Sequence, residues 1–281
     1  MRRLSAVLLA LGVAALGGCG GGPSKNSFLA EADDTCRSAN APVASAKAPT
    51  SFPELAEGAK GVAAATDAQV PELRALDRPG GDKERTDAVF AALGGVATTA
   101  RSLQAAAEKK DDRASAQAAN DLSARSREAG DGARAYGFTA CGVGTQRAAT
   151  PLTDATKTII KAGFVAKAEG ICRETSRKLE GIPEPTSRTS ASRAFNTLLP
   201  LADKMITDLR ALVVPPGDEA TLTDLFDAEQ KVLEKLREYL AVLKADDSRK
   251  ASVVEDELEV AGTAADAKAD AYGVKACGTD F

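Results

Sequence analysis

Apolar side chains recur at steps of three and four residues over long stretches of this chain, which is the spacing of one helix face. The clearest stretch covers residues 222–243, where Glu229 is the single polar interruption of an apolar stripe. Comparable spacing predicts further helices over residues 164–179, 190–212 and 254–272. No segment alternates β-branched and polar residues between turn signals, so the pattern predicts no strands. The sequence therefore predicts an all-α protein.

Residues that favour helix ends interrupt this pattern. Asp82 and Asp218 each follow a Pro/Gly turn, where a short carboxylate can accept hydrogen bonds from the free amides of a first helical turn. Gly137 and Gly273 stand where a helix favours a left-handed C-terminal residue. Pro200 is expected to kink or split the helix over residues 190–212, because proline removes a backbone donor.

An internal duplication organises the chain. Phe28 and Phe164 lie 136 positions apart, and many other residues repeat at this offset without any gap. Chance does not account for so many matching turn, cysteine and aromatic positions. The repeated segments include 36–37 with 172–173, 73–76 with 209–212, 135–137 with 271–273, and 140–142 with 276–278.

The duplication predicts two copies of one domain, over residues 24–143 and 153–281. Between them the Gly/Thr-rich residues 144–152 are expected to form a linker, with Pro151 near the first position of the next helix. Each copy contains four predicted helices with short connections, which favours an antiparallel bundle. We expect two tandem antiparallel four-helix bundles.

Composition supports the helical prediction and excludes one class of partner. Charged residues make up 27% of the chain and aromatic residues 4%, and tryptophan is absent, a profile that favours helices. The 36 basic and 40 acidic residues give a net charge of −4. Nucleic acid is therefore not an expected partner, because phosphates require a basic surface.

Five cysteines divide into Cys19 near the N-terminus and four in the repeated part of the chain. The four allow three pairings. The duplication favours Cys36 with Cys141 and Cys172 with Cys277, because each pair spans the same 105 residues. Each bridge would close one bundle by joining its first helix to the segment after its last helix. A metal site or a redox pair is the weaker alternative, because CxxC spacing and histidine are both absent.

The absence of histidine also narrows the chemistry that the chain can perform. It removes the usual general base near neutral pH, the serine and cysteine triads, and most transition-metal sites. The acidic pairs at residues 111–112 and 246–247 precede the last helix of each copy, where helix capping explains them better than paired-carboxylate catalysis. We expect no catalytic residue, no metal and no cofactor, and therefore no enzyme.

Six polar residues recur in both copies and are candidate binding residues. Arginines can contact anions, and tyrosines can contact a ligand. In a structural role, tyrosine would pack over the disulfide and arginine would cover apolar surface with its stem, and this interpretation is favoured. The six candidates are Arg37 with Arg173, Arg74 with Arg210, and Tyr136 with Tyr272.

Residues 16–19, Leu-Gly-Gly-Cys, close an apolar run that starts behind two arginines. The run over residues 4–16 is shorter than the roughly 20 residues of a membrane span, and it fits the core of a signal peptide. The segment resembles the lipobox of exported bacterial lipoproteins, and the Ala/Arg/Asp-rich usage resembles that of actinobacterial ones. The resemblance implies a signal peptide over residues 1–18 and a diacylglycerol on Cys19, which becomes the mature N-terminus.

Under this resemblance, residues 19–27 form the lipidated cysteine and a flexible tether. Removal of residues 1–18 takes two arginines from the 36 basic residues, which leaves 34 against 40 acidic residues and a charge of −6. Anionic lipid therefore does not attract the folded part, and two or more acyl chains would hold the protein at the membrane. We expect an extracytoplasmic protein anchored to the cell membrane.

The two copies differ most in the third helix of each predicted bundle. Copy one has smaller side chains there and also Gly94 and Gly95, so we expect it to be the less stable half. The favoured interpretation is a thinner, tightly packed copy one, and the alternative is that the missing volume leaves an apolar groove for a ligand. The compared positions are Ala97, Ala100 and Ala107 in copy one and Leu233, Leu236 and Leu243 in copy two.

Two functions from different classes fit these observations. The first is a membrane-tethered binding module for an apolar ligand or a partner protein of the envelope. The second is a structural or interaction protein of the cell envelope without a small-molecule site. An apolar cavity with a few polar groups would favour the first, and a packed interior with an exposed apolar strip would favour the second.

Overall fold

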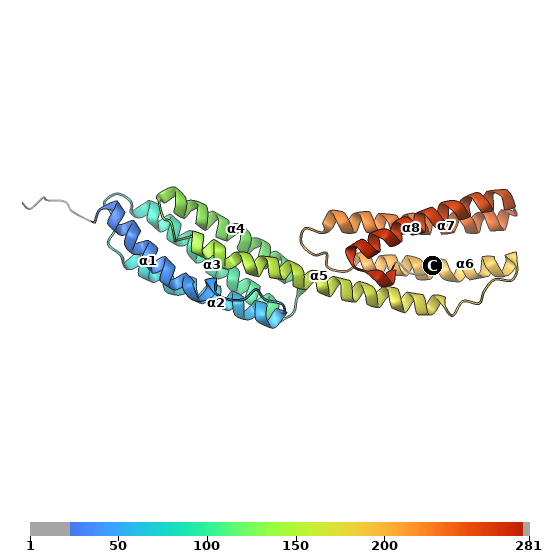
Figure 1. Cartoon of the computed structure of the whole chain (residues 1–281), viewed down its shortest axis with the longest axis horizontal. Coiled ribbons are helices and arrows are strands. Elements are labelled where there is room, and N and C mark those ends of the chain that lie inside the picture. The colour runs from blue at the N-terminus through green and yellow to red at the C-terminus, as the bar shows by residue number, and fades with distance from the viewer. Residues whose placement is uncertain (1–22, 278–281) are drawn as a thin grey trace, which may run out of the picture.

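The computed structural model describes residues 23–277, and every regular element within that range is helical. This confirms the all-α prediction. Short connections join consecutive helices, as Figure 1 shows. The elements are α1 (Lys25–Ala44), α2 (Phe52–Ala75), α3 (Lys83–Glu108), α4 (Asp112–Tyr136), α5 (Val143–Leu179), α6 (Arg188–Arg210), α7 (Glu219–Ala245), α8 (Ser248–Tyr272) and the short 3₁₀ helix η1 (Lys275–Cys277).

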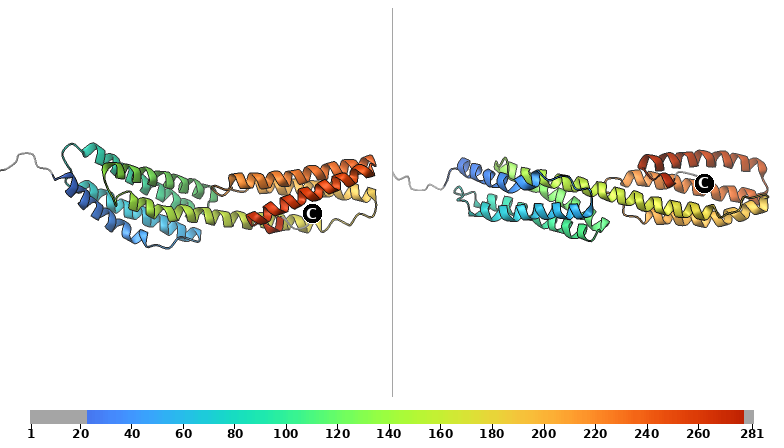
Figure 2. Two further views of the ribbon diagram at one scale, coloured as in Figure 1. Left: turned by 45° about the horizontal axis from the view of Figure 1, so that its top comes forward. Right: turned by 60° about the horizontal axis from the view of Figure 1, so that its bottom comes forward.

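Two helical bundles follow one another along the long axis of the molecule (Figures 1 and 2). The first bundle consists of α1 to α4 and the first half of α5, and α5 packs against α1, α2 and α4. The second bundle consists of the second half of α5 with α6, α7 and α8. The long helix α5 therefore belongs to both bundles and joins them.

The expected linker over residues 144–152 is wrong, because this segment forms the first turns of α5. Gly142, with a φ of 72°, is the N-cap residue, and Pro151 lies inside the helix rather than at its first position. Burial stabilises this helical segment, since Ala149 and Leu152 are 1% and 4% exposed and belong to the core of the first bundle. The first bundle therefore has five helical segments rather than four.

The cores of the two bundles differ in continuity. In the first bundle one cluster of buried residues extends from Phe28 in α1 to Leu152 in α5. In the second bundle the described residues form three separate clusters, which contain Phe226, Val232 and Leu233 respectively. The first bundle is thus packed around one core, and the second is packed in sections.

Several helix ends are as predicted. Gly137 and Gly273 are left-handed C-cap residues with φ of 118° and 99°. Asp111 and Asp247 each accept a hydrogen bond of 3.0 Å from a backbone amide of the following first turn, which confirms helix capping at both positions. Helix α6 continues through Pro200 without splitting.

Two predicted caps are wrong in their chemistry. Asp82 and Asp218 occupy the N-cap positions of α3 and α7, but their side chains make no capping hydrogen bond. Each carboxylate instead accepts a hydrogen bond from a tyrosine hydroxyl. The backbone of both residues, with φ and ψ of −97° and 4° at Asp82 and of −99° and 5° at Asp218, also lies outside the extended region that is typical of capping residues.

The small side chains of α3 are packed tightly. Ala97, Ala100 and Ala107 are each at most 1% exposed, and α3 runs through Gly94 and Gly95 without a break. The neighbouring helices therefore close on these positions, as the favoured interpretation expected.

The N-terminal predictions fall mostly outside the described part of the chain. Cys19 and the lipobox lie outside it. Helix α1 begins at Lys25, where the side chain of Ser24 accepts a hydrogen bond from the backbone amide of Ser27, so the last residues of the expected tether are helical. Within residues 23–277 no helix combines the length and the apolar character that a membrane span needs.

Candidate functional site

Each bundle is closed by one disulfide, and both predicted pairings are confirmed. Cys36 in α1 is bonded to Cys141, and Cys172 in α5 is bonded to Cys277, with a Cα–Cα distance of 5.0 Å in each. Each bridge joins the first helix of its repeat to the segment that follows the fourth. The two ends of each repeat are therefore held together.

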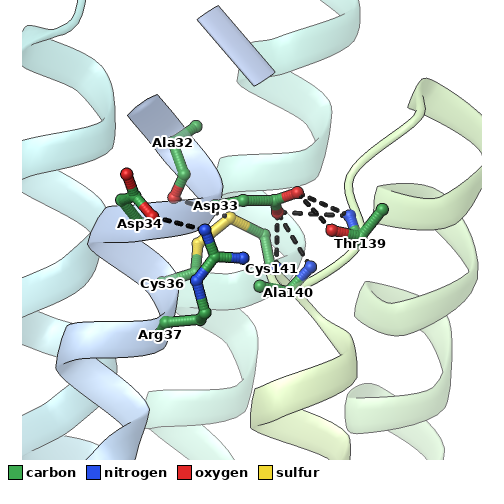
Figure 3. Close-up of polar contacts among 8 residues, drawn as sticks. All are labelled: Ala32, Asp33, Asp34, Cys36, Arg37, Thr139, Ala140 and Cys141. Carbon is green, nitrogen blue, oxygen red and sulfur yellow. Dashed lines mark hydrogen bonds and ion pairs between the residues drawn. A yellow bond between two sulfur atoms is a disulfide. The ribbon is translucent and has the colours of Figure 1, made fainter. Parts of the chain in front are cut away.

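A buried carboxylate fixes the segment that carries the second cysteine of the first bridge (Figure 3). Asp33 accepts hydrogen bonds from the backbone amides of Thr139, Ala140 and Cys141 at 2.8–3.2 Å, and from the Thr139 hydroxyl at 2.6 Å. Burial alone would raise the pKa of Asp33, but these hydrogen bonds together lower it below its ordinary value. Asp33 thus orients Cys141 toward Cys36.

The second bundle repeats this arrangement in a reduced form. Glu169, at the repeat position of Asp33, accepts a hydrogen bond of 2.8 Å from the backbone amide of Ala276. It also pairs with Arg173 at 2.6 Å. Sequence reasoning missed both carboxylates, although an acidic residue three positions before the first cysteine of each repeat was the available signal.

The recurring tyrosines lie at one end of each bundle. The Tyr136 hydroxyl donates to Asp82 Oδ2 at 2.9 Å, and the Tyr272 hydroxyl donates to Asp218 Oδ2 at 2.8 Å. Burial and then the hydrogen bond to Asp82 raise the pKa of Tyr136 to about 12, and the same causes raise the pKa of Tyr272. These pairs link the last helix of each bundle to the start of its third helix.

Each tyrosine ring is also enclosed by a cation and a phenylalanine. Lys25 lies 4.4 Å above the Tyr136 ring, and Lys161 lies 4.3 Å above the Tyr272 ring. Phe28 and Phe164 contact the two tyrosines edge-on. The structure therefore gives both tyrosines a packing and hydrogen-bonding role within the bundle.

The four candidate arginines are not gathered at one site. Arg37 pairs with the neighbouring Asp34, as Figure 3 shows. Arg210 lies over the Phe226 ring and donates to the Phe226 carbonyl at 3.3 Å. Arg74 is exposed near the end of α2.

The fourth candidate, Arg173, lines an apolar groove of about 940 Å³ in the second bundle, which we call the second-bundle groove. It lies between α5, α6 and the loop that joins them. Arg177, Glu180 and Glu184 add charged groups to its edges. Its apolar surface is formed by Leu179, Ile182, Pro185, Ala194, Phe195 and Leu198.

The first bundle has a corresponding groove of about 890 Å³ between α1, α2 and their connecting loop. Val43 and Val62 line it at the repeat positions of Leu179 and Leu198. Here, however, the first half of α5 forms an additional wall that includes Leu152. The alternative interpretation of the sequence places a groove at the small side chains of α3, whereas both observed grooves lie between the first two helices of a bundle and the loop that joins them.

Glu229 is a buried carboxylate in the core of the second bundle. It is 5% exposed, and within the described residues its Oε1 atom has no hydrogen-bond partner. Burial first, and the charge of Asp266 second, raise the pKa of Glu229 to about 7. The repeat position in the first bundle is Leu93, which is fully buried.

The two repeats also differ by a polar and an apolar residue on the neighbouring helix. Met205 lies beside Glu229 at a small cavity between α6 and α7. The repeat position of Met205 is Gln69, which is fully buried and has neither side-chain polar atom hydrogen-bonded within residues 23–277. Each bundle therefore buries one polar side chain at this level of its core, from different helices.

Comparison with known proteins adds no assignment to this geometry. No protein-family model matches the chain, and neither the curated proteins nor the solved structures include a match.

Proposed function

We propose that this protein is a membrane-tethered, extracytoplasmic lipoprotein whose folded part is a binding module. The ligand is an apolar molecule or an envelope protein, and the site is the second-bundle groove. The observation that carries the proposal is this groove of about 940 Å³, with apolar walls and a few charged groups at its edges. Such a combination is typical of binding sites in proteins.

Two features support the proposed location. The lipobox resemblance at residues 16–19 supports a lipid anchor on Cys19. The two disulfides support an exported protein, because such bonds persist in oxidising compartments. The first bundle starts at Lys25 and would therefore lie close to the membrane.

A structural or interaction protein of the envelope is the second candidate function. It is favoured by Val253 and Val260 on α8, which are 54% and 71% exposed. Exposed apolar side chains on one helix can mark a contact surface for another protein. If this second candidate is correct, a protein with both Val253→Ser and Val260→Ser should no longer recover its envelope partner. If the binding module is correct, the same double variant should leave binding in the groove unchanged.

The lipid anchor is tested by labelling cells with a fatty acid analogue. We expect label on the intact protein and none on the Cys19→Ala variant, because the thiol is the attachment point. Cys36→Ala with Cys141→Ala is the control, and it should retain the label. Label that persists on the Cys19→Ala variant would contradict the anchor.

The binding site is tested with a hydrophobic fluorescent dye on the purified chain. Ala194→Trp should fill the groove and reduce dye binding by about tenfold or more, whereas Ala194→Ser should leave it unchanged. Dye binding that is equal in all three proteins would contradict the groove as the site. Mass spectrometry of protein purified gently from its native membrane should then show what it retains.

A further inference from the structure

We infer that the second-bundle groove receives an α-helix of another protein, in the position that the first half of α5 takes in the first bundle. The inference rests on the proposed function, in which this groove is the binding site. It adds the class of ligand, a partner helix, and the direction in which that helix lies.

The place that α5 takes in the first bundle has no described counterpart in the second. In the first bundle the chain passes from Cys141 directly into α5, which packs against α1, α2 and α4. Cys277 is the repeat position of Cys141, and it is the last residue that the structure describes. Among the described residues, therefore, no helix takes the corresponding place beside α5, α6 and α8.

The surface on which α5 packs in the first bundle has a counterpart in the second-bundle groove. A Cβ atom on Gly144 would lie 2.8 Å from Asn40 Nδ2, and one on Gly58 would lie 2.7 Å from Leu152 Cδ2, so α5 approaches α1 and α2 closely. The repeat positions of Asn40 and Gly58 are Ser176 and Ala194. Both of these residues line the second-bundle groove.

Matched apolar side chains are more exposed in the second bundle than in the first. Ala59 and Val62 in α2 are 0% and 3% exposed in the first bundle. Phe195 and Leu198 occupy the same repeat positions in α6, and these larger side chains are only partly buried. Apolar area left in water is unfavourable by roughly 25 cal/mol per Å², so a covering helix would be stabilised here.

The geometry also indicates the chemistry of the partner helix. In the first bundle Gly144, Ala148 and Leu152 follow at four-residue steps, so small and then larger apolar residues share one helix face. A helix in the second-bundle groove with the direction of α5 would start near Arg177 and end near Glu184. Acidic residues in its first turn and basic residues in its last turn would match these charges and its own dipole.

The probe for this inference is a peptide of residues 142–160 of this chain, with a benzophenone side chain in place of Leu152. On the full-length protein we expect saturable photo-crosslinks that map to residues 194–198 and are displaced by unlabelled peptide. Ala59, at the repeat position of Phe195, should not be labelled, because it is 0% exposed in the first bundle. A peptide carrying Leu152→Asp should displace the probe at least tenfold less well.

Variants of the groove provide the matched controls. Ala194→Trp should reduce the crosslink yield at least fivefold, and Ala194→Ser should leave it unchanged. Leu198→Gln tests the next turn without a bulky side chain, and it should also weaken crosslinking. Circular dichroism would confirm that each variant keeps its helical content.

Five results would each overturn the inference. Crosslinks outside the groove, or equal crosslinks to the Ala194→Trp protein, would exclude helix docking at this position. Labelled fatty acid that binds in the groove without any peptide binding would leave the proposed function standing and replace the helix by a lipid. A dimer of the full chain that is lost in the Ala194→Trp variant would identify a second copy as the occupant. If neither the peptide, the fatty acid nor the dye binds, the proposed function is contradicted as well.

Discussion

The inner face of α2 in the first bundle is covered, whereas the matching face of α6 in the second bundle is partly exposed. Ala59 and Val62 are almost fully buried, but Phe195 and Leu198 at the same repeat positions are not. The difference follows from α5, whose first half covers the first bundle. The first-bundle groove therefore has α5 as an additional wall, whereas no described α-helix forms the corresponding wall of the second-bundle groove.

This comparison reverses one expectation from the sequence. The small side chains of α3 predicted that the first bundle is the less stable half. Ala100 and Ala107 are nevertheless packed in one continuous core, which also includes Leu152 of α5. We now expect the first bundle to be the more stable half.

Removal of one disulfide should have the largest effect and should separate the two bundles. A bridge that closes 105 residues contributes up to about 4–5 kcal/mol in the chain-entropy model. Cys172→Ser with Cys277→Ser should unfold the second bundle without denaturant. Cys36→Ser with Cys141→Ser should only lower the denaturant midpoint of the first.

Denaturant titration combined with hydrogen exchange measures the two bundles separately in the full chain. The chain with both disulfides is the control. An equal loss of stability in the two bundles would contradict the difference in how completely their cores are packed.

A matched pair of leucine substitutions should sharpen the comparison. Leu122 in α4 is fully buried, and Leu258 at its repeat position in α8 is partly buried. Leu122→Ala should lower the free energy of unfolding by about 2–5 kcal/mol, because it leaves a cavity. Leu258→Ala should lower it by about 1 kcal/mol or less, because this side chain is only partly buried. Urea unfolding of each variant would measure both losses of stability. A larger loss for Leu258→Ala would contradict the difference between a closed first bundle and a more open second one.

Glu229 should make only the second bundle sensitive to pH near neutrality. Burial in the folded state raises its pKa from about 4.5 to about 7, so the folded state favours the protonated form. The second bundle should therefore lose stability as pH rises from about 4.5 to 7, by a total on the order of 3 kcal/mol. Glu229→Leu, which restores the residue type of Leu93, should remove this loss.

Thermal unfolding between pH 5 and pH 8 would measure this dependence. Asp227→Asn is the control, because Asp227 is an exposed neighbour, and it should keep the pH dependence of the natural chain. A Glu229→Leu protein with an unchanged pH slope would show that this carboxylate is not the cause.

The carboxylates near the disulfides should give the smallest effects and should also differ. Asp33→Asn disturbs hydrogen bonds from three backbone amides and should lower the free energy of unfolding by about 1–3 kcal/mol. Glu169→Gln disturbs one such hydrogen bond and should lower it by about 1 kcal/mol. Because folding lowers the pKa of Asp33, its contribution is present above about pH 4 and is lost as pH falls further. Acid unfolding of both variants would measure these contributions to stability. Equal losses for Asp33→Asn and Glu169→Gln would contradict the difference between the two carboxylates.

Much of the fold was predictable because it depends on local signals. The helical spacing, the left-handed Gly137 and Gly273, and the capping residues Asp111 and Asp247 act within one or two turns. The disulfide pairing was predictable because the repeat gave Cys36–Cys141 and Cys172–Cys277 the same separation.

The remaining features depend on contacts between distant segments. Pro151 stays helical because its neighbours pack on the first bundle, and no local signal indicates this. Asp82 and Asp218 lost their predicted capping role to tyrosines 54 residues away. The grooves depend on which helices pack beside α5. The spacing of apolar residues along one helix does not specify this.

Hydrogen exchange on the intact, oxidised chain tests the central claim most directly, namely that α5 covers the inner face of α2 while the matching face of α6 stays partly exposed. We expect the amides of residues 55–63 in α2 to exchange at least tenfold more slowly than those of residues 191–199 in α6, because local opening of α6 exposes less buried surface. Equal or slower exchange in residues 191–199 would show that the second bundle is as closed as the first, and would contradict this account.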